Sequence, residues 1–123
     1  MLDIFIKSFT SESFIAPSGS PQNVQLKSLS STTIEVTWAE VPTIDRNGLI
    51  ILYEIQYEPL DEPGGTPGRP ARRITNTTEL SVLLTALNPF VTYAISVRAY
   101  TGVGHGPYSD VLFERTEQDG KHI

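Results

Sequence analysis

Hydrophobic and polar residues alternate along most of this chain with a period of two. Ile34, Val36 and Trp38 alternate with Glu35 and Thr37, which is the pattern of a strand that buries one face and exposes the other. Similar alternations occur at residues 24–26, 51–57, 80–84, 93–99 and 111–113. Because no segment shows a convincing helical period, the pattern predicts an all-β chain.

The residues between these segments predict where strands begin and end. Asn47-Gly48 is a turn signal, and after it the odd-numbered residues of 51–57 are predicted to share one face while Glu54 and Gln56 share the other. Residues 58–73 contain four prolines and three glycines, a composition that predicts a long loop. A short edge strand is expected at residues 71–75, at the end of that loop.

The segment 87–99 is the most informative part of the chain, because it joins a turn signal to a strand and places Tyr93 at the corner between them. A tyrosine at such a corner directs its ring between two sheets and its hydroxyl toward the backbone of the turn. Seven strands at this spacing predict a β-sandwich. Its core is expected to include Trp38, Tyr53, Ile55, Leu87, Pro89, Tyr93 and Val97.

Several short motifs follow one another along residues 17–117. They are Pro21-x-x-Val24, Trp38, Asn47-Gly48 before Tyr53-x-Ile55-x-Tyr57, Leu87-x-Pro89-x-x-x-Tyr93-x-Ile95-x-Val97-x-Ala99, Gly104-x-Gly106-Pro107-x-Ser109 and Thr116-Glu117. In this order and spacing they resemble the fibronectin type III domain family. The resemblance implies a seven-stranded immunoglobulin-like β-sandwich with sheets A-B-E and G-F-C-C′. Two departures are Thr101, where the family often has asparagine, and the Pro/Gly-rich loop between strands C and C′.

The same resemblance divides the chain into a domain at residues 17–117, a tail or linker at 1–16 and a tail at 118–123. Residues 3–8 can be aligned with residues 110–115, which belong to the last expected strand. One hypothesis is that residues 1–12 are the last strand of a preceding module in a tandem array. The alternative is a disordered tail or a vector-derived segment. As an unpaired apolar strand, residues 4–6 would favour self-association through strand pairing.

Composition limits the partners that the chain can bind and the covalent and metal sites that it can form. A chain of 123 residues can bury a core without metals or disulfides. Its formal charge of −5 and pI near 4.9 argue against nucleic acid as a partner, because that partner requires a basic surface. The absence of cysteine excludes disulfides and thiolate metal sites. No stretch approaches the roughly 20 apolar residues that a membrane span needs, so no direct membrane insertion by this segment is expected.

No catalytic, metal or cofactor site is expected. The histidines are His105, between two glycines, and His122, next to the C-terminal residue, and neither has a metal-ligating partner at a usable spacing. The glycines within residues 102–106 imitate a phosphate loop, but a strand rather than a helix follows them, so a hairpin turn is favoured. Asp61 and Glu62 lack the further oxygen ligands that calcium needs. The chain is therefore not predicted to be an enzyme, although its parent protein could carry a separate catalytic domain.

Two surface features are candidates for contact with a partner. The hairpin before the last strand carries Val103 and His105 at its tip and Tyr108 at its base, and it resembles the loop with which some family members contact receptors. The alternative for Tyr108 is a structural role, packing beside Pro107 at the hairpin base. The second feature is a basic cluster of Arg69, Arg72 and Arg73. It suits a sulfated glycan or an acidic neighbour, or it is a solvated edge strand that discourages aggregation.

Asn76-Thr77-Thr78 is an acceptor motif for N-linked glycosylation. We expect Asn76 on the surface, just before the strand at residues 80–84.

The family resemblance implies a non-catalytic extracellular protein-interaction and spacer module of a cell-surface receptor or adhesion protein, such as a receptor tyrosine phosphatase or an axon-guidance receptor. Its partners would be an unidentified protein and neighbouring tandem repeats, without a cofactor. Its location would be the extracellular portion of a single-pass membrane protein, with a secreted matrix protein as a further option. Two alternatives are a structural spacer in an intracellular muscle or filament protein and an accessory domain of a secreted carbohydrate-active enzyme.

Overall fold

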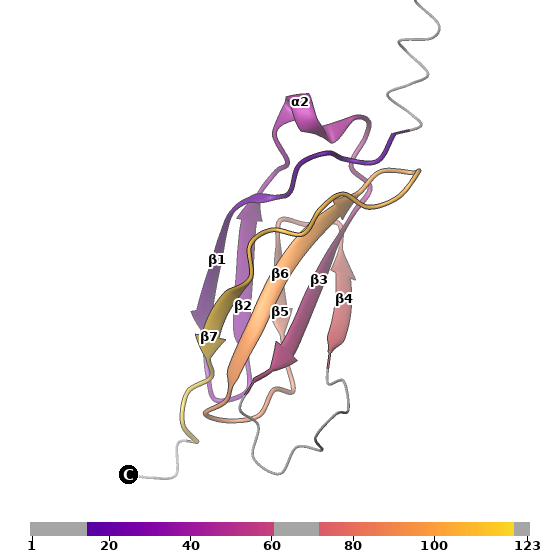
Figure 1. Ribbon diagram of the computed structural model, residues 1–123. Coiled ribbons are helices and arrows are strands. Elements are labelled where there is room, and N and C mark those ends of the chain that lie inside the picture. Colours follow the sequence, from indigo (N-terminus) through magenta and orange to yellow (C-terminus); the bar gives the residue numbers. More distant parts are fainter. Residues whose placement is uncertain (1–14, 61–71, 120–123) are drawn as a thin grey trace, which may run out of the picture.

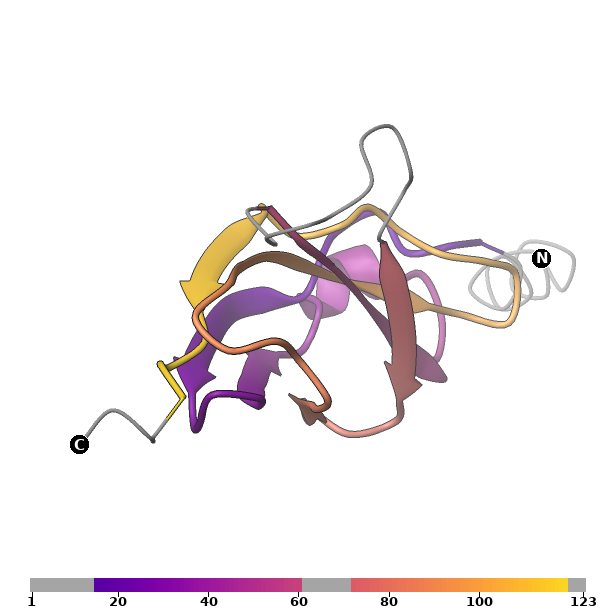
Figure 2. The ribbon, with the colours of Figure 1, turned by 90° about the horizontal axis from the view of Figure 1, so that it is seen from below.

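The computed structural model describes residues 15–60 and 72–119. Within these residues the strands are β1 (Gln22–Ser28), β2 (Ile34–Ala39), β3 (Leu52–Pro59), β4 (Arg73–Thr77), β5 (Ser81–Leu84), β6 (Thr92–Tyr100) and β7 (Leu112–Arg115). They form a three-stranded sheet, β1-β2-β5, and a four-stranded sheet, β4-β3-β6-β7, in which every pair is antiparallel. The two sheets face each other (Figure 1 and Figure 2). Strands A, B and E correspond to β1, β2 and β5, and strands G, F, C and C′ to β7, β6, β3 and β4, so the predicted seven-stranded sandwich with these two sheets is confirmed.

The core fills the space between the two sheets. Six of the seven residues predicted for it are buried, namely Trp38, Tyr53, Ile55, Leu87, Tyr93 and Val97. Trp38 of β2 and Tyr53 of β3 join the two layers with their ring centroids 5.5 Å apart, an aromatic contact that adds to their burial. The prediction for Pro89 was wrong, because this residue is exposed. Pro89 lies in the turn before β6, where its fixed φ favours a turn and its ring faces solvent.

Tyr93 forms the predicted corner between the turn and β6. Its side chain is fully buried, and its hydroxyl accepts a hydrogen bond from the Asn88 N–H at 2.9 Å. Thr116, which follows β7, completes the corner by donating to the Asn88 carbonyl at 2.6 Å and accepting the Val91 N–H at 3.0 Å. The polar groups of this turn are therefore satisfied, as burial requires.

One helical element was not predicted. α2 (Thr43–Arg46) is a single turn, and Asn47 ends it in the left-handed conformation with a φ of 56°. Gly48 follows with a φ of 144°, and the chain then continues toward β3. Asn47-Gly48 is thus a helix C-cap rather than a two-residue hairpin loop. A helix of one turn is too short to produce a hydrophobic period.

Two edge strands differ from their expected positions. β4 begins at Arg73 and includes Asn76, which was expected in the connection after that strand. β7 begins at Leu112, after the Val111 that was expected in it; Val111 and Phe113, whose alternation predicted the strand, are exposed, whereas Leu112 is half-buried. Edge strands cover only the margin of the core, so their alternation is a weak signal.

Several predictions lie outside the described residues. They concern the strand at residues 1–12, the interpretation of Asp61 and Glu62 as carboxylates that do not hold calcium, Arg69 and His122. The described part of the chain has no helix with the length and apolar character that a membrane span requires.

Candidate interaction surface at the linker end

The chain enters the sandwich at one end and leaves it at the other (Figure 1). The end at which it enters is built from residues 15–21, residues 40–51 with α2, residues 78–80 and the β6–β7 hairpin at 101–108. We call this the linker end. It brings together segments that are far apart in the sequence, so its geometry depends on the fold.

The segment before β1 is hydrogen-bonded to the α2 side of the linker end. The Ser18 N–H donates to the Asp45 carbonyl at 2.9 Å, and the Asn47 side-chain amide donates to the Ala16 carbonyl at 3.1 Å. The left-handed turn after α2 thus places an amide where it holds the incoming chain. These two hydrogen bonds hold the backbone of residues 16–18 against the α2 turn.

Thr101 holds the same segment from the hairpin side. Its hydroxyl donates to the Ile15 carbonyl at 3.0 Å and accepts the Val103 N–H at 3.3 Å. The threonine therefore still binds the backbone of its own loop, although the family often has asparagine at this position. Residues 15–18 are held between α2 and the hairpin.

Gly106 allows the hairpin to approach the incoming chain closely. A Cβ atom on Gly106 would lie 2.7 Å from the carbonyl oxygen of Pro17, a distance that would force the backbone to shift. By contrast, a Cβ on Gly102 or Gly104 would meet no atom within 4 Å. The base of the hairpin therefore requires glycine, while its tip is open.

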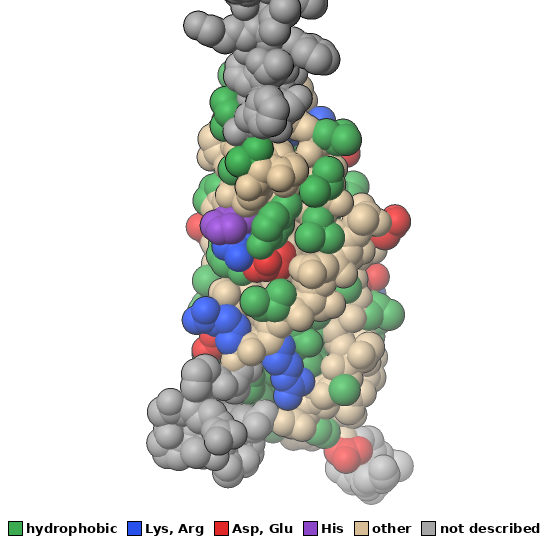
Figure 3. Space-filling model, turned by 90° about the vertical axis from the view of Figure 1, so that its right-hand side faces the viewer, with side chains coloured by type: hydrophobic (Ala, Val, Ile, Leu, Met, Phe, Trp, Pro, Cys, Tyr) green, Lys and Arg blue, Asp and Glu red, His purple; other side chains and the backbone are tan. Residues whose placement is uncertain are grey.

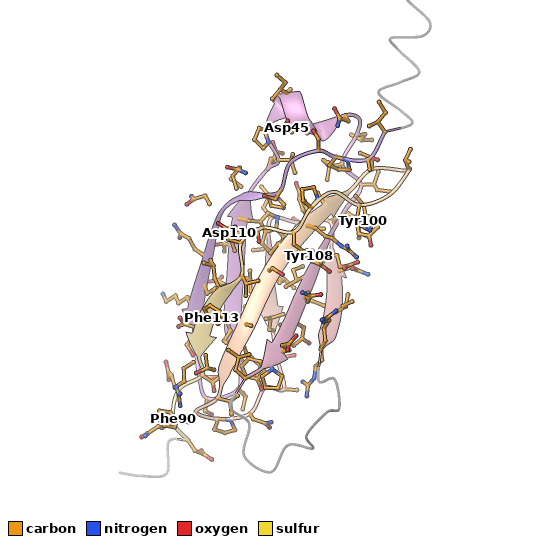
Figure 4. All side chains as sticks on the ribbon, in the orientation of Figure 1. Asp45, Phe90, Tyr100, Tyr108, Asp110 and Phe113 are labelled. Carbon is orange, nitrogen blue, oxygen red and sulfur yellow. The ribbon has the colours of Figure 1, made fainter. Side chains whose placement is uncertain are left out.

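Glu54 is buried at 6% exposure on the outer face of the four-stranded sheet, where the alternation of β3 places it. Its Oε1 accepts a hydrogen bond from the Tyr100 hydroxyl at 2.6 Å, and its Oε2 accepts one from the Tyr108 hydroxyl. Arg98 donates to the same carboxylate, with Nε 3.0 Å from Oε2. Figure 4 shows Tyr100 and Tyr108 side by side near the end of β6. Two strands and the returning hairpin thus meet at one carboxylate.

Stacked rings extend this Glu54 cluster toward the hairpin tip. The Arg98 guanidinium lies over the Tyr108 ring, 4.4 Å from its centroid, and 5.6 Å from the Tyr100 centroid. The His105 ring meets the Tyr100 ring edge-on at 5.7 Å. Figure 3 shows the histidine beside basic, acidic and hydrophobic side chains on this face. Tyr108 therefore holds the hairpin base, through Glu54 and Arg98.

The cluster changes the ionisation of its members. Burial alone raises the pKa of Glu54, but the hydrogen bonds from Tyr100 and Tyr108 and the charge of Arg98 outweigh it, so the pKa lies below its usual value. Burial and the hydrogen bond to Glu54 raise the pKa of Tyr108 to about 12. The hydrogen bond to Glu54, followed by burial, raises the pKa of Tyr100. At neutral pH the cluster is therefore a carboxylate held by two neutral phenols and a guanidinium.

Large apolar side chains are exposed around this fixed framework. Ile44 and Leu49 are 85% and 79% exposed, the highest values among the large hydrophobic residues of the described chain. The linker end also exposes Ile15, Ile51, Leu80 and Val103. In Figure 3, hydrophobic side chains gather below the grey residues at this end. Exposed apolar side chains gathered at one end of a domain are typical of a contact surface.

Comparison with known sequences and structures identifies the family. The sequence model of the fibronectin type III domain matches residues 19–115. This chain belongs to that family. The solution structure of the third fibronectin III domain of human KIAA0343 protein superposes on it with a TM-score of 0.76 and 27% identity, covering 88% of this chain and 89% of that one.

Curated relatives of this fibronectin type III domain are much longer proteins. They include protein sidekick-1 of Mus musculus at 39% identity, receptor-type tyrosine-protein phosphatase F of Homo sapiens at 38% and cell adhesion molecule Dscam2 of Drosophila melanogaster at 34%. Each match covers 84% of this chain and 5% of the relative's own length. The chain thus corresponds to a small part of each relative.

The domain separates the residues that were predicted to bind a partner. Val103 and His105 are exposed on the hairpin. Arg72 and Arg73 instead lie at the start of β4, beside the far end of β3, and Arg69 lies outside the described residues. The hairpin and the basic cluster therefore belong to two separate surfaces, and both remain predictions as binding sites.

The described residues offer little to a metal or a small substrate. They contain no group of three or more His, Asp or Glu side chains that could hold a metal ion. One hollow of about 370 Å³ lies along β1 and β7 and is lined mainly by Val24, Leu26, Leu112 and Phe113. Its lining has no histidine, and its one carboxylate, that of Glu114, accepts a hydrogen bond from the Ser28 N–H at 3.1 Å. The arrangement is suited to surface contact.

Proposed function

We propose that this fibronectin type III domain is a non-catalytic interaction and spacer module in the extracellular portion of a single-pass membrane receptor or adhesion protein. The observation that carries the proposal is the course of the chain, which enters at one end, is fixed there, and leaves at the other (Figure 1). A module with this course keeps the segment that precedes it and the segment that follows it at opposite ends of a rigid domain. Its linker end holds the incoming chain at a defined place.

The chemistry of the linker end supports a preceding repeat of the same polypeptide as its neighbour. Ile15 is exposed and tied to Thr101, so the incoming backbone lies among the exposed apolar side chains. Beside these apolar side chains, Arg46 and Glu40 form an ion pair at 2.9 Å, so their two charges neutralise each other. A neighbour that is already tethered needs only a modest apolar contact, because the linker supplies a high effective concentration. Two of the relatives are a receptor-type tyrosine-protein phosphatase and a cell adhesion molecule by name, which supports the proposed location.

The test uses a fragment that joins residues 1–123 to the repeat that precedes them in the natural polypeptide. Backbone ¹⁵N relaxation measures the rotational correlation time of each repeat. We expect both repeats to tumble as one body, and the double substitution Leu49→Ser and Val103→Ser to let them tumble independently.

Leu83→Ser is the matched control. Leu83 is also exposed, at 52%, but it lies on β5 of the three-stranded sheet and outside the linker end. This substitution should leave the correlation times unchanged. Repeats that tumble independently without any substitution would contradict a fixed contact at the linker end.

A further inference from the structure

Among residues 15–60 and 72–119, no strand pairs with the outer edge of β4, so this edge is open to a further strand. β4 is hydrogen-bonded to β3 on one side and is the terminal strand of its sheet. Ile74 lies in this strand and is 54% exposed. An exposed apolar residue on a free edge favours pairing with a second chain, and proteins commonly cover or block such edges.

Asn76 lies on the same face of β4 as Ile74. In the register of the sheet, Asn76 is opposite Glu54 and Ile74 is opposite Gln56, and directly opposed residues share a face. That face is the outer one, because Glu54 meets Arg98 there. Two residues along a strand are about 7 Å apart, so a group attached to Asn76 reaches Ile74.

The acceptor motif is accessible in the folded domain. Asn76 and Thr78, the two residues that an Asn-x-Thr acceptor requires, are both exposed. A branched, hydrated group on Asn76 would extend into solvent without displacing any core residue. Because β4 is the terminal strand, a bulky group on Asn76 lies beside its free edge and hinders the approach of a second strand sterically.

We propose that Asn76 carries an N-linked glycan and that this glycan shields Ile74 and the open edge of β4. The inference rests on the proposed extracellular location, since the donor is a lipid-linked sugar diphosphate of the secretory pathway. The Asn76 side-chain nitrogen forms a bond to the anomeric carbon of the sugar, the bond from that carbon to the diphosphate oxygen breaks, and the nitrogen loses one proton. The lipid diphosphate is the leaving group, and no oxidant or reductant is needed.

Occupancy is tested by producing residues 1–123 behind a secretion signal in a eukaryotic cell. Mass spectrometry should find one glycan that peptide N-glycosidase removes. Asn76→Gln and Thr78→Ala should each abolish it, whereas Thr77→Ala, which keeps the motif, should retain it. Secreted wild-type protein without a glycan on Asn76 would overturn the proposal. The secretion signal is supplied in this experiment, so a missing glycan says nothing about the natural location. The proposed location fails on a different result, namely that the natural parent protein is found inside the cell.

Shielding is tested by sedimentation velocity over rising protein concentration. We expect the glycosylated domain to remain monomeric and the Thr78→Ala domain to shift to higher sedimentation coefficients. Adding Ile74→Thr to Thr78→Ala should restore the monomer. Identical sedimentation with and without the glycan would contradict a shielding role.

Discussion

Both ends of β6 are anchored by tyrosine hydroxyls, but by different physical means. At the start of β6, Tyr93 buries its whole ring in the core and accepts one backbone hydrogen bond. At the far end, Tyr100 and Tyr108 donate to the Glu54 carboxylate on the outer face. The first anchor depends on apolar burial and a neutral hydrogen bond. The second depends on charge-assisted hydrogen bonds, so a change in the ionisation of Glu54, Tyr100 or Tyr108 would weaken it.

The largest effect is expected at the Tyr93 corner. Tyr93→Ala should lower the free energy of unfolding by about 3–5 kcal/mol through lost burial and a cavity. Tyr93→Phe, which keeps the ring and removes only the hydroxyl, should cost about 1 kcal/mol. Urea unfolding measures both, and equal losses from the two variants would contradict a corner stabilised mainly by ring burial.

Glu54→Gln tests the other anchor. It removes the charge opposite Arg98, whose side chain is 18% exposed, and we expect a loss of about 2 kcal/mol, below the usual range for a fully buried pair because solvent screens part of the charge. Glu58→Gln is the control. Glu58 lies 3.6 Å from Arg72 in an exposed pair, so its loss should stay below about 0.5 kcal/mol. If the two substitutions lowered the free energy of unfolding equally, the Glu54 cluster would not be what anchors the far end of β6.

Gly106→Ala tests the contact between the hairpin and the incoming chain. The added Cβ must displace the Pro17 carbonyl, and we expect a loss of about 1–2 kcal/mol from this overpacking. Hydrogen exchange of the residue 18 amide should become faster at the same time. Gly104→Ala, which adds its methyl group in open space, should change stability by less than about 0.5 kcal/mol. A normal exchange rate in the Gly106→Ala variant would show that residues 15–18 are held by other contacts.

Acid should weaken the Glu54 anchor. The folded-state pKa of Glu54 lies below its usual value, so the folded state holds fewer protons than the unfolded chain. Its stabilisation is present above the usual glutamate pKa and is lost as the pH falls through the lowered folded-state value. The stability difference between wild type and Glu54→Gln should therefore shrink in acid. A difference that stays constant down to pH 3 would contradict this linkage.

Alkali should remove the contribution of Tyr108 to stability. The pKa of Tyr108 is raised to about 12 in the folded domain, so the unfolded chain loses this proton first, near the ordinary tyrosine value of about 10. Stability from Tyr108 is complete below that value and is lost as the pH rises toward about 12. Tyr108→Phe should lessen this alkaline loss in urea titrations. An unchanged alkaline slope would show that Tyr108 does not couple folding to this proton.

The contrast between the two anchors also explains what could be predicted. The Tyr93 corner was found because a turn motif and its tyrosine lie within a few residues of one another. The side of β3 that carries Glu54 was predicted as well, since alternation is local. The burial of Glu54 was not, because it comes from Tyr108, which is 54 residues away along the chain. The α2 turn and the position of β4 were missed because one helical turn and a short edge strand leave little periodic signal.

The amino-acid sequence by itself determined the two-layer architecture and most of its core, because period-two alternation and turn chemistry act between near neighbours. Only the tertiary structure decided the linker end. There Ile15 meets Thr101 across 86 residues of sequence, Pro17 passes within contact of Gly106, and a carboxylate becomes buried beneath the returning hairpin. Such contacts depend on strand register and on the path of the hairpin, and the pattern of single residues along the chain does not contain either.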